Sequence, residues 1–186
     1  MFLAKNPLGQ IPVLECTDTV TNKTFTLVNS IAIIDFLDSA FPDRWSMIPK
    51  DPVEKALAME VVDTLEILQQ NVFLIGDLER STRGKLTAKT EAIALHKKIL
   101  TRVESLIGRC KEGTHGPFAT GTFVPNIVDA VLVPQLYNAR RFGLDIQAMF
   151  PILAEIDTLC QSHPWFTSSH PSAQPDAEQE GQRLAV

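Results

Sequence analysis

The spacing of apolar residues changes near residue 50. Before that point, the runs Ile11–Cys16 and Phe25–Val28 flank a polar stretch, which predicts an antiparallel β-hairpin. Asn29 and Ser30 then precede the apolar run Ile31–Leu37, which predicts a short helix with a capped N-terminus. Beyond residue 50, apolar residues recur every three or four positions, which is typical of one face of a helix. The sequence therefore predicts a small strand-containing unit followed by an all-helical part.

The helical part has a clear start. Asp51–Glu54 combines an N-cap aspartate, a proline at the first helical position and a glutamate three residues after the cap. Asn126 and Asp129 form a similar capping pair, which we interpret as structural. From Leu57 to Ile75 the apolar residues are 4, 4, 3, 4 and 3 apart. The same period predicts further helices over Ala92–Leu106, Ile127–Phe142 and Pro151–Gln161.

These elements predict an α+β fold that is mostly α. We expect a first unit at 1–41, a linker at 42–50, a helical domain at 51–170 and a loose tail at 171–186. A hairpin and one helix make a marginal unit on their own. Either the helical bundle covers the hairpin, or related proteins have further strands upstream.

Composition narrows the class of protein. The 186 residues carry a net charge of −5 with 45% hydrophobic residues, and no Lys/Arg cluster exceeds two in a row. Electrostatic docking on nucleic acid is therefore not expected. The longest apolar runs are far short of the roughly 20 residues of a membrane span. The three cysteines are widely spaced and no Cys/His pair has metal-binding spacing, so we expect a reducing, cytoplasmic location and no metal site.

Four stretches together carry a resemblance to a known family. They are N-P-L-G-Q-I-P-V-L at 6–14, N-S-I-A-I-I-D-F-L at 29–37, D-A-V-L-V-P-Q-L-Y-N-A-R-R-F at 129–142 and H-P-S-A-Q-P-D at 170–176. With them, nearly the whole chain resembles the zeta-class glutathione transferases, the maleylacetoacetate isomerases. The resemblance implies that the first unit is a truncated thioredoxin-like, glutathione-binding domain and that 51–170 is the glutathione-transferase-type helical domain.

The resemblance also implies a site for glutathione. Ile11 and Pro12 correspond to the family's backbone clamp, in which the proline is cis and the preceding residue pairs with the cysteinyl part of glutathione. Asn29 and Ser30 correspond to the residues that hold the γ-glutamyl carboxylate, although the family usually has Gln where this chain has Asn29. Asn71 matches a further family position. The alternative interpretations are a strand-start proline, a plain N-cap and an exposed helix face.

For the second substrate, the resemblance points to Arg141 and Gln70. Arg141 matches the position taken to bind a substrate carboxylate, and a guanidinium suits that task. Its alternative is a favourable place at a helix C-terminus, and Gln70 could equally lie on an exposed face. In the family, a preceding β-α-β unit carries an S-S-C-type motif that activates the glutathione thiol. The sequence given contains no such motif, so we assign no catalytic residue and expect no isomerisation at an enzymatic rate by these 186 residues.

Two hypotheses follow from the resemblance. The first is a cytoplasmic, homodimeric, glutathione-dependent maleylacetoacetate isomerase of tyrosine and phenylalanine catabolism. The second is a non-catalytic glutathione-transferase-like module for binding or assembly.

Overall fold

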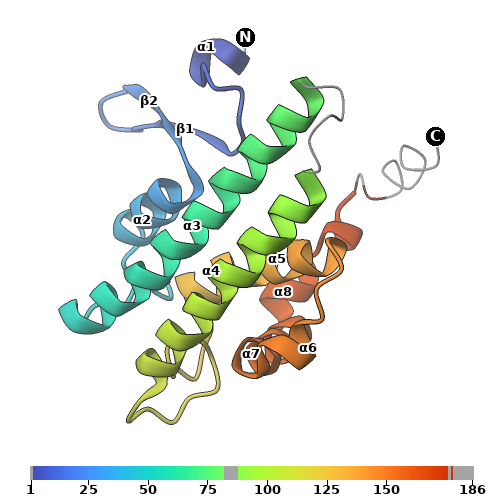
Figure 1. Cartoon of the computed structure of the whole chain (residues 1–186). Coiled ribbons are helices and arrows are strands. Elements are labelled where there is room, and N and C mark those ends of the chain that lie inside the picture. Colours follow the sequence, from blue (N-terminus) through green and yellow to red (C-terminus); the bar gives the residue numbers. More distant parts are fainter. Residues whose placement is uncertain (1, 82–87, 176, 178–186) are drawn as a thin grey trace. The chain divides into compact units, whose positions relative to one another are not determined.

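The computed structural model describes residues 2–81, 88–175 and 177 (Figure 1). The chain divides into two compact units, Met1–Ile48 and Pro49–Val186, with the division inside the linker expected at 42–50. Each unit is described separately.

The first unit contains helix α1 (Phe2–Lys5), strands β1 (Val13–Thr17) and β2 (Thr24–Val28), and helix α2 (Ser30–Ala40). The strands are antiparallel, with Val13 opposite Val28 and Thr17 opposite Thr24, so the predicted hairpin is confirmed. The Asp18 carboxylate accepts hydrogen bonds of 2.8 Å from the backbone N–H groups of Val20 and Thr21, which fixes the turn between the strands.

Helix α2 packs on the hairpin through aromatic side chains. Phe25 on β2 and Phe36 on α2 meet edge to face, with ring centroids 5.4 Å apart. Helix α1 was not predicted, because its four residues are too few to show a helical period.

Within its described residues, the second unit contains helices and loops and no strand. It consists of α3 (Pro52–Ser81), α4 (Ala88–Lys111), α5 (Ile127–Arg141), α6 (Ile146–Met149), α7 (Pro151–Ser162), α8 (Pro164–Ser169) and the 3-10 helix η1 (Pro171–Ala173). The four long helices confirm the predictions from apolar spacing. The short elements α6, α8 and η1 were not predicted from it, and most of the tail expected at 171–186 lies outside the described residues.

The core of this unit lies between α3, α4, α5 and α7. Leu65 and Leu68 on α3, Leu100 on α4, Leu132 on α5 and Leu153 on α7 are all fully buried. Helices α3 and α4 run side by side (Figure 1). The predicted apolar stripes are therefore the faces on which these helices pack.

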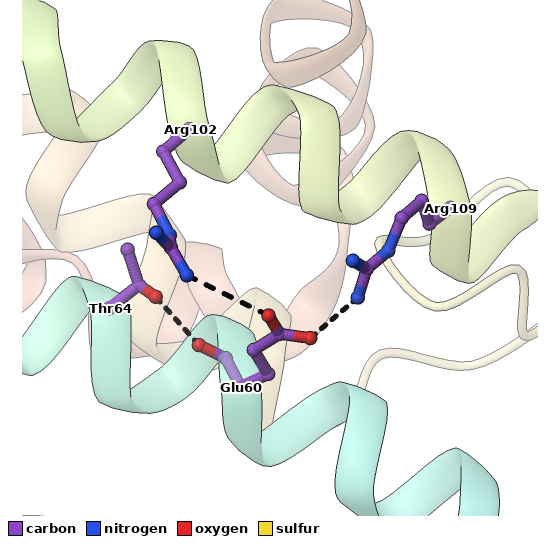
Figure 2. A network of polar contacts seen from close by, with 4 residues as sticks. All are labelled: Glu60, Thr64, Arg102 and Arg109. Carbon is purple, nitrogen blue, oxygen red and sulfur yellow. Dashed lines mark hydrogen bonds and ion pairs between the residues drawn. The ribbon is translucent and has the colours of Figure 1, made fainter.

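An ion-pair network also links α3 to α4 (Figure 2). The Glu60 carboxylate accepts a hydrogen bond of 2.5 Å from Arg109 and lies 3.7 Å from the guanidinium of Arg102. The backbone carbonyl of Glu60 accepts a 2.7 Å hydrogen bond from the Thr64 hydroxyl. All three charged side chains are partly exposed, so the network contributes little beyond fixing the register of the two helices.

The start of α5 is held by a buried capping box, as predicted. The Asn126 side chain accepts from the Val128 N–H at 2.9 Å, and Asp129 accepts from the Asn126 N–H at 2.9 Å. The second oxygen of Asp129 accepts from the Ala119 N–H at 2.9 Å, which ties the preceding loop to the helix.

Within the described residues, no helix is long and apolar enough to cross a membrane.

Candidate functional site

In the first unit, two predicted ligand-binding elements lie at the same end of the hairpin. The register that pairs Val13 with Val28 leads, one strand step outward, to Pro12 and Ile11 on one side and to Asn29 and Ser30 on the other. The Ile11–Pro12 peptide bond is cis, as the resemblance predicts. Ile11 is 84% exposed, and no hydrogen bond within the described residues engages its backbone N–H or C=O. The backbone N–H and C=O of Ile11 are therefore free to pair with an extended ligand.

The start of α2 provides a place for a carboxylate. Asn29 is the N-cap, with an unusual φ of 78°, and its side-chain oxygen accepts from the N–H groups of Ile31 at 2.9 Å and Ala32 at 3.4 Å. Asn29 therefore acts as a cap, so both the capping and the ligand interpretation stay open for it. Neither the hydroxyl nor the N–H of Ser30 has a hydrogen-bond partner in the described chain. Ser30 thus presents two donors at the positive end of a helix dipole, which fits the γ-glutamyl carboxylate of glutathione.

The second unit contains a pocket of about 400 Å³ between one face of α3 and one face of α5. Its lining residues follow helical spacing on both helices, with Gln69, Val72 and Phe73 from α3 and Gln135, Asn138, Arg141 and Phe142 from α5 and its C-cap. Val72, Phe73 and Phe142 supply apolar wall, and the remaining side chains are polar. Among the described residues, one cation, Arg141, and no carboxylate line this pocket.

The two arginines at the end of α5 have different surroundings. Arg140 forms an ion pair with Asp157 on α7, whose carboxylate is almost fully buried. Arg141 lines the pocket, and no carboxylate of the described residues pairs with it. The Arg141 guanidinium carbon lies 6.0 Å from the centroid of the Tyr137 ring, one helical turn earlier. The Tyr137 ring in turn meets the ring of His170 edge to face at 6.0 Å. Arg140 is therefore structural, and Arg141 is available for an acidic ligand.

The polar part of the pocket is anchored in the core. Gln135 is 2% exposed, and its side-chain amide donates a hydrogen bond to the side-chain oxygen of Gln69. This bond joins α5 to α3 across the base of the pocket.

A buried histidine supports the opposite wall. His96 on α4 is fully buried and packs against Phe142, with ring centroids 5.1 Å apart and the ring planes tilted by 47°. Its Nδ1 lies 2.7 Å from the Ala92 carbonyl oxygen, while Nε2 has no partner among the described residues. Burial lowers the pKa of His96 from its ordinary value, against the opposing effect of the Ala92 hydrogen bond. His96 is therefore neutral at neutral pH and leaves Arg141 as the charge of the pocket.

Gln70 and Asn71 are both exposed on α3 and do not line this pocket. The Asn71 side chain donates to the Ile67 carbonyl oxygen of its own helix at 2.7 Å. The assignments of these two residues stay predictions. The sequence interpretation gave no role to Gln69, Gln135 or Asn138. The spacing of 135, 138, 141 and 142 on one helical face was the signal that could have identified the α5 residues.

The described part of the chain was also searched for reactive cysteines and metal-binding clusters. Three free cysteines are present, and burial raises the pKa of the Cys160 thiol to about 12. No group of three or more His, Cys, Asp or Glu side chains within the residues searched is arranged to hold a metal ion.

Comparisons with known proteins identify relatives of the chain, although no protein-family model matches it. It is 31% identical over 179 residues to a Drosophila melanogaster protein named probable maleylacetoacetate isomerase 2, covering 94% of this chain and 70% of the relative. It is 30% identical to the maleylacetoacetate isomerase of Pseudomonas aeruginosa, covering 94% of this chain and 77% of that protein.

A solved structure shows the same similarity. The maleylacetoacetate isomerase of Anaeromyxobacter dehalogenans, with glutathione bound in its active site, matches with a TM-score of 0.79 and 31% identity over 94% of this chain and 77% of that one. A maleylpyruvate isomerase described as a zeta-class glutathione transferase matches with a TM-score of 0.74 and 26% identity, over 94% of this chain and 79% of that one.

Proposed function

Because this chain belongs to the maleylacetoacetate isomerase family of zeta-class glutathione transferases, we propose that it binds glutathione and a cis-unsaturated dicarboxylate for glutathione-dependent cis–trans isomerisation. We further propose maleylacetoacetate as the acid, tyrosine and phenylalanine catabolism as the pathway, the cytoplasm as the location and a homodimer as the assembly. The observation that carries the proposal is Arg141, which lines the pocket. Among the described residues, its guanidinium has no acidic partner and no carboxylate lines that pocket.

In this proposal, Ser30 and Ile11 hold glutathione. The Ser30 N–H and hydroxyl donate to the γ-glutamyl carboxylate, and the Ile11 peptide group pairs with the cysteinyl backbone. Glutathione supplies a thiol that adds reversibly to a conjugated double bond. Asn29 holds the first turn of α2 in place, so that the two Ser30 donors are oriented before the ligand arrives.

Arg141 holds and orients the acid. A guanidinium binds a carboxylate through two parallel hydrogen bonds, which fixes the rotation of the bound acid as well as its position. The apolar wall formed by Val72, Phe73 and Phe142 reduces contact with water and so strengthens this charge interaction.

Calorimetric titration with maleate, a cis-unsaturated dicarboxylate, tests the proposal. We expect Arg141→Ala to weaken maleate binding by about ten- to a hundredfold, the effect of losing a charge-assisted hydrogen bond. Arg102→Ala is the matched control, because it removes the same charge from the surface of α4 in the same unit (Figure 2). Equal binding by Arg141→Ala and the wild type would refute the role of this pocket.

A further inference from the structure

We propose that Asn6 is a positioning residue for the glutathione site of the first unit, and that it acts by fixing the direction of the Ile11 N–H. The inference rests on the proposed function, in which the backbone of Ile11 pairs with the cysteinyl part of glutathione. Asn6 lies in the first of the four family-like stretches, but the sequence interpretation gave its side chain no role.

The first observation is the burial of Asn6. It is 5% exposed, and among the described residues of the first unit only Asn6 and Ile48 are buried. Burying an amide costs free energy unless its polar atoms are hydrogen-bonded. Asn6 forms its hydrogen bonds with backbone groups of its own loop, so they act directly on the course of that loop.

The second observation is the direction of the Asn6 amide. Its Oδ1 accepts a hydrogen bond of 3.2 Å from the Leu8 N–H, and its Nδ2 donates one of 2.6 Å to the Gln10 carbonyl oxygen. The backbone of Asn6 is held as well, because its N–H donates to the Phe2 carbonyl at 3.0 Å and its carbonyl accepts from the Gly9 N–H at 2.9 Å. Each polar atom of Asn6 therefore has a partner, and these partners fix the side chain with its NH₂ group on the Gln10 carbonyl.

The Gln10 carbonyl and the Ile11 N–H belong to the same peptide group. This group is planar and trans, so its C=O and N–H bonds point in opposite directions. Anchoring the carbonyl to Asn6 therefore also sets the direction of the N–H. The Ile11 N–H itself has no hydrogen-bond partner within the described residues, and Ile11 is 84% exposed. The loop thus presents a free donor whose direction is fixed from behind by a buried amide.

Fixing a donor before the ligand arrives removes an ordering cost from binding. The two parts of the proposed glutathione site are held separately, because the Asn29 side chain caps the helix that begins at Ser30. Loss of the Asn6 amide should therefore weaken the contact with the cysteinyl part of glutathione and leave the contact of Ser30 with the γ-glutamyl part unchanged.

Two ligands distinguish these contacts. Glutathione has the cysteinyl carbonyl that accepts from the Ile11 N–H in this proposal, whereas γ-glutamylcysteamine keeps the γ-glutamyl part, the amide N–H and the thiol but lacks that carbonyl. NMR titration of the full chain measures both affinities. Asn6→Leu keeps nearly the same shape without a hydrogen-bonding group. We expect it to weaken glutathione binding by about three- to tenfold, the effect of one neutral hydrogen bond, and to leave γ-glutamylcysteamine binding unchanged.

The ratio of the two affinities separates positioning from folding. If Asn6→Leu lowers the folded fraction of the chain, both apparent affinities fall by the same factor and their ratio stays constant. Asn22→Gly is the control, because it removes an exposed side-chain amide from the turn of the same unit at a φ of 54°, which glycine adopts without strain. It should leave both affinities unchanged, whereas Ser30→Ala should weaken both ligands.

An unchanged ratio in Asn6→Leu would overturn the inference. So would a loss that γ-glutamylcysteinamide does not share, because this ligand restores the carbonyl without the glycine of glutathione. If γ-glutamylcysteamine binds too weakly to titrate, glutathione and the double variant Asn6→Leu/Ser30→Ala decide. Independent sites multiply the two losses, and a smaller combined loss would assign Asn6 to folding alone. Failure of the proposed function looks different, because the wild type then does not bind glutathione.

Discussion

Arg140 at the end of α5 donates a hydrogen bond to the carboxylate of Asp157, which is 1% exposed on α7. The same carboxylate oxygen accepts a 2.7 Å hydrogen bond from Gln161. The next residue, Arg141, lines the pocket instead. Adjacent residues of the same type thus differ in their surroundings: Arg140 has a structural partner, and Arg141 carries the proposed binding role.

This difference predicts a large loss of stability for one alanine variant and almost none for the other. Arg140→Ala leaves a buried carboxylate without its cation and should lower the free energy of unfolding by about 3 kcal/mol. Arg141→Ala should change it by no more than about 0.5 kcal/mol, because this side chain is exposed and has no acidic partner in the described residues. Urea denaturation of both variants checks this, and a larger loss for Arg141→Ala would assign Arg141 to structure.

A second prediction concerns the capping box of α5. Asp129→Ala removes the acceptor of two buried N–H groups, those of Asn126 and Ala119, and should cost about 2–4 kcal/mol of unfolding free energy. Asp129→Asn keeps one acceptor oxygen and should cost less. Thermal or urea unfolding of the two variants would show the order, and equal losses would contradict this account of the cap.

A third prediction concerns pH. Burial holds the pKa of His96 below its ordinary value of 6.5, so below that pH the unfolded chain binds a proton that the folded chain does not bind. His96 should therefore contribute a fall in the unfolding free energy as the pH decreases from 7 to 5. In His96→Phe, which keeps a ring against Phe142, this fall should be smaller. Urea titrations of both proteins at pH 7 and pH 5 measure the difference, and an unchanged pH dependence in the variant would exclude His96 as its source.

A fourth prediction concerns Asn29. Its φ of 78° is a conformation that glycine adopts without strain and alanine does not. Asn29→Ala loses both the cap hydrogen bonds and the tolerance for this φ, so we expect about 1–2 kcal/mol of destabilisation of the first unit. Asn29→Gly should cost only about a few tenths of a kcal/mol. Circular dichroism during thermal unfolding measures the stability of both variants. Equal stability of the glycine and alanine variants would contradict this explanation.

The sequence predicts the long elements of this fold well, because their apolar residues repeat over many turns. The helices α3, α4, α5 and α7 and the hairpin follow directly from such spacing. Helices α1 and α6 have four residues each, too few for a period to show. Helix α6 begins instead at a local cap, the Asp145 side chain, which accepts from the Ala148 N–H at 3.0 Å.

The candidate site was predictable only in part. Arg141 and Ser30 stand in stretches that resemble the family, and the structure gives both of them free donors within the described residues. The Gln69–Gln135 hydrogen bond joins residues 66 positions apart, and only the packing of α3 on α5 brings them together. A one-dimensional pattern could not distinguish Gln69 from Gln70, because both are polar residues at the edge of one apolar stripe.

The central claim is that this chain binds glutathione through Ser30 and an acid through Arg141. Calorimetric titration of glutathione into the wild type, Ser30→Ala and Arg141→Ala tests the glutathione half most directly. We predict wild-type binding, a loss of about tenfold or more for Ser30→Ala as a charge-assisted hydrogen bond disappears, and unchanged binding for Arg141→Ala. The absence of glutathione binding to the wild type, or equal affinity in the wild type and Ser30→Ala, would contradict the account.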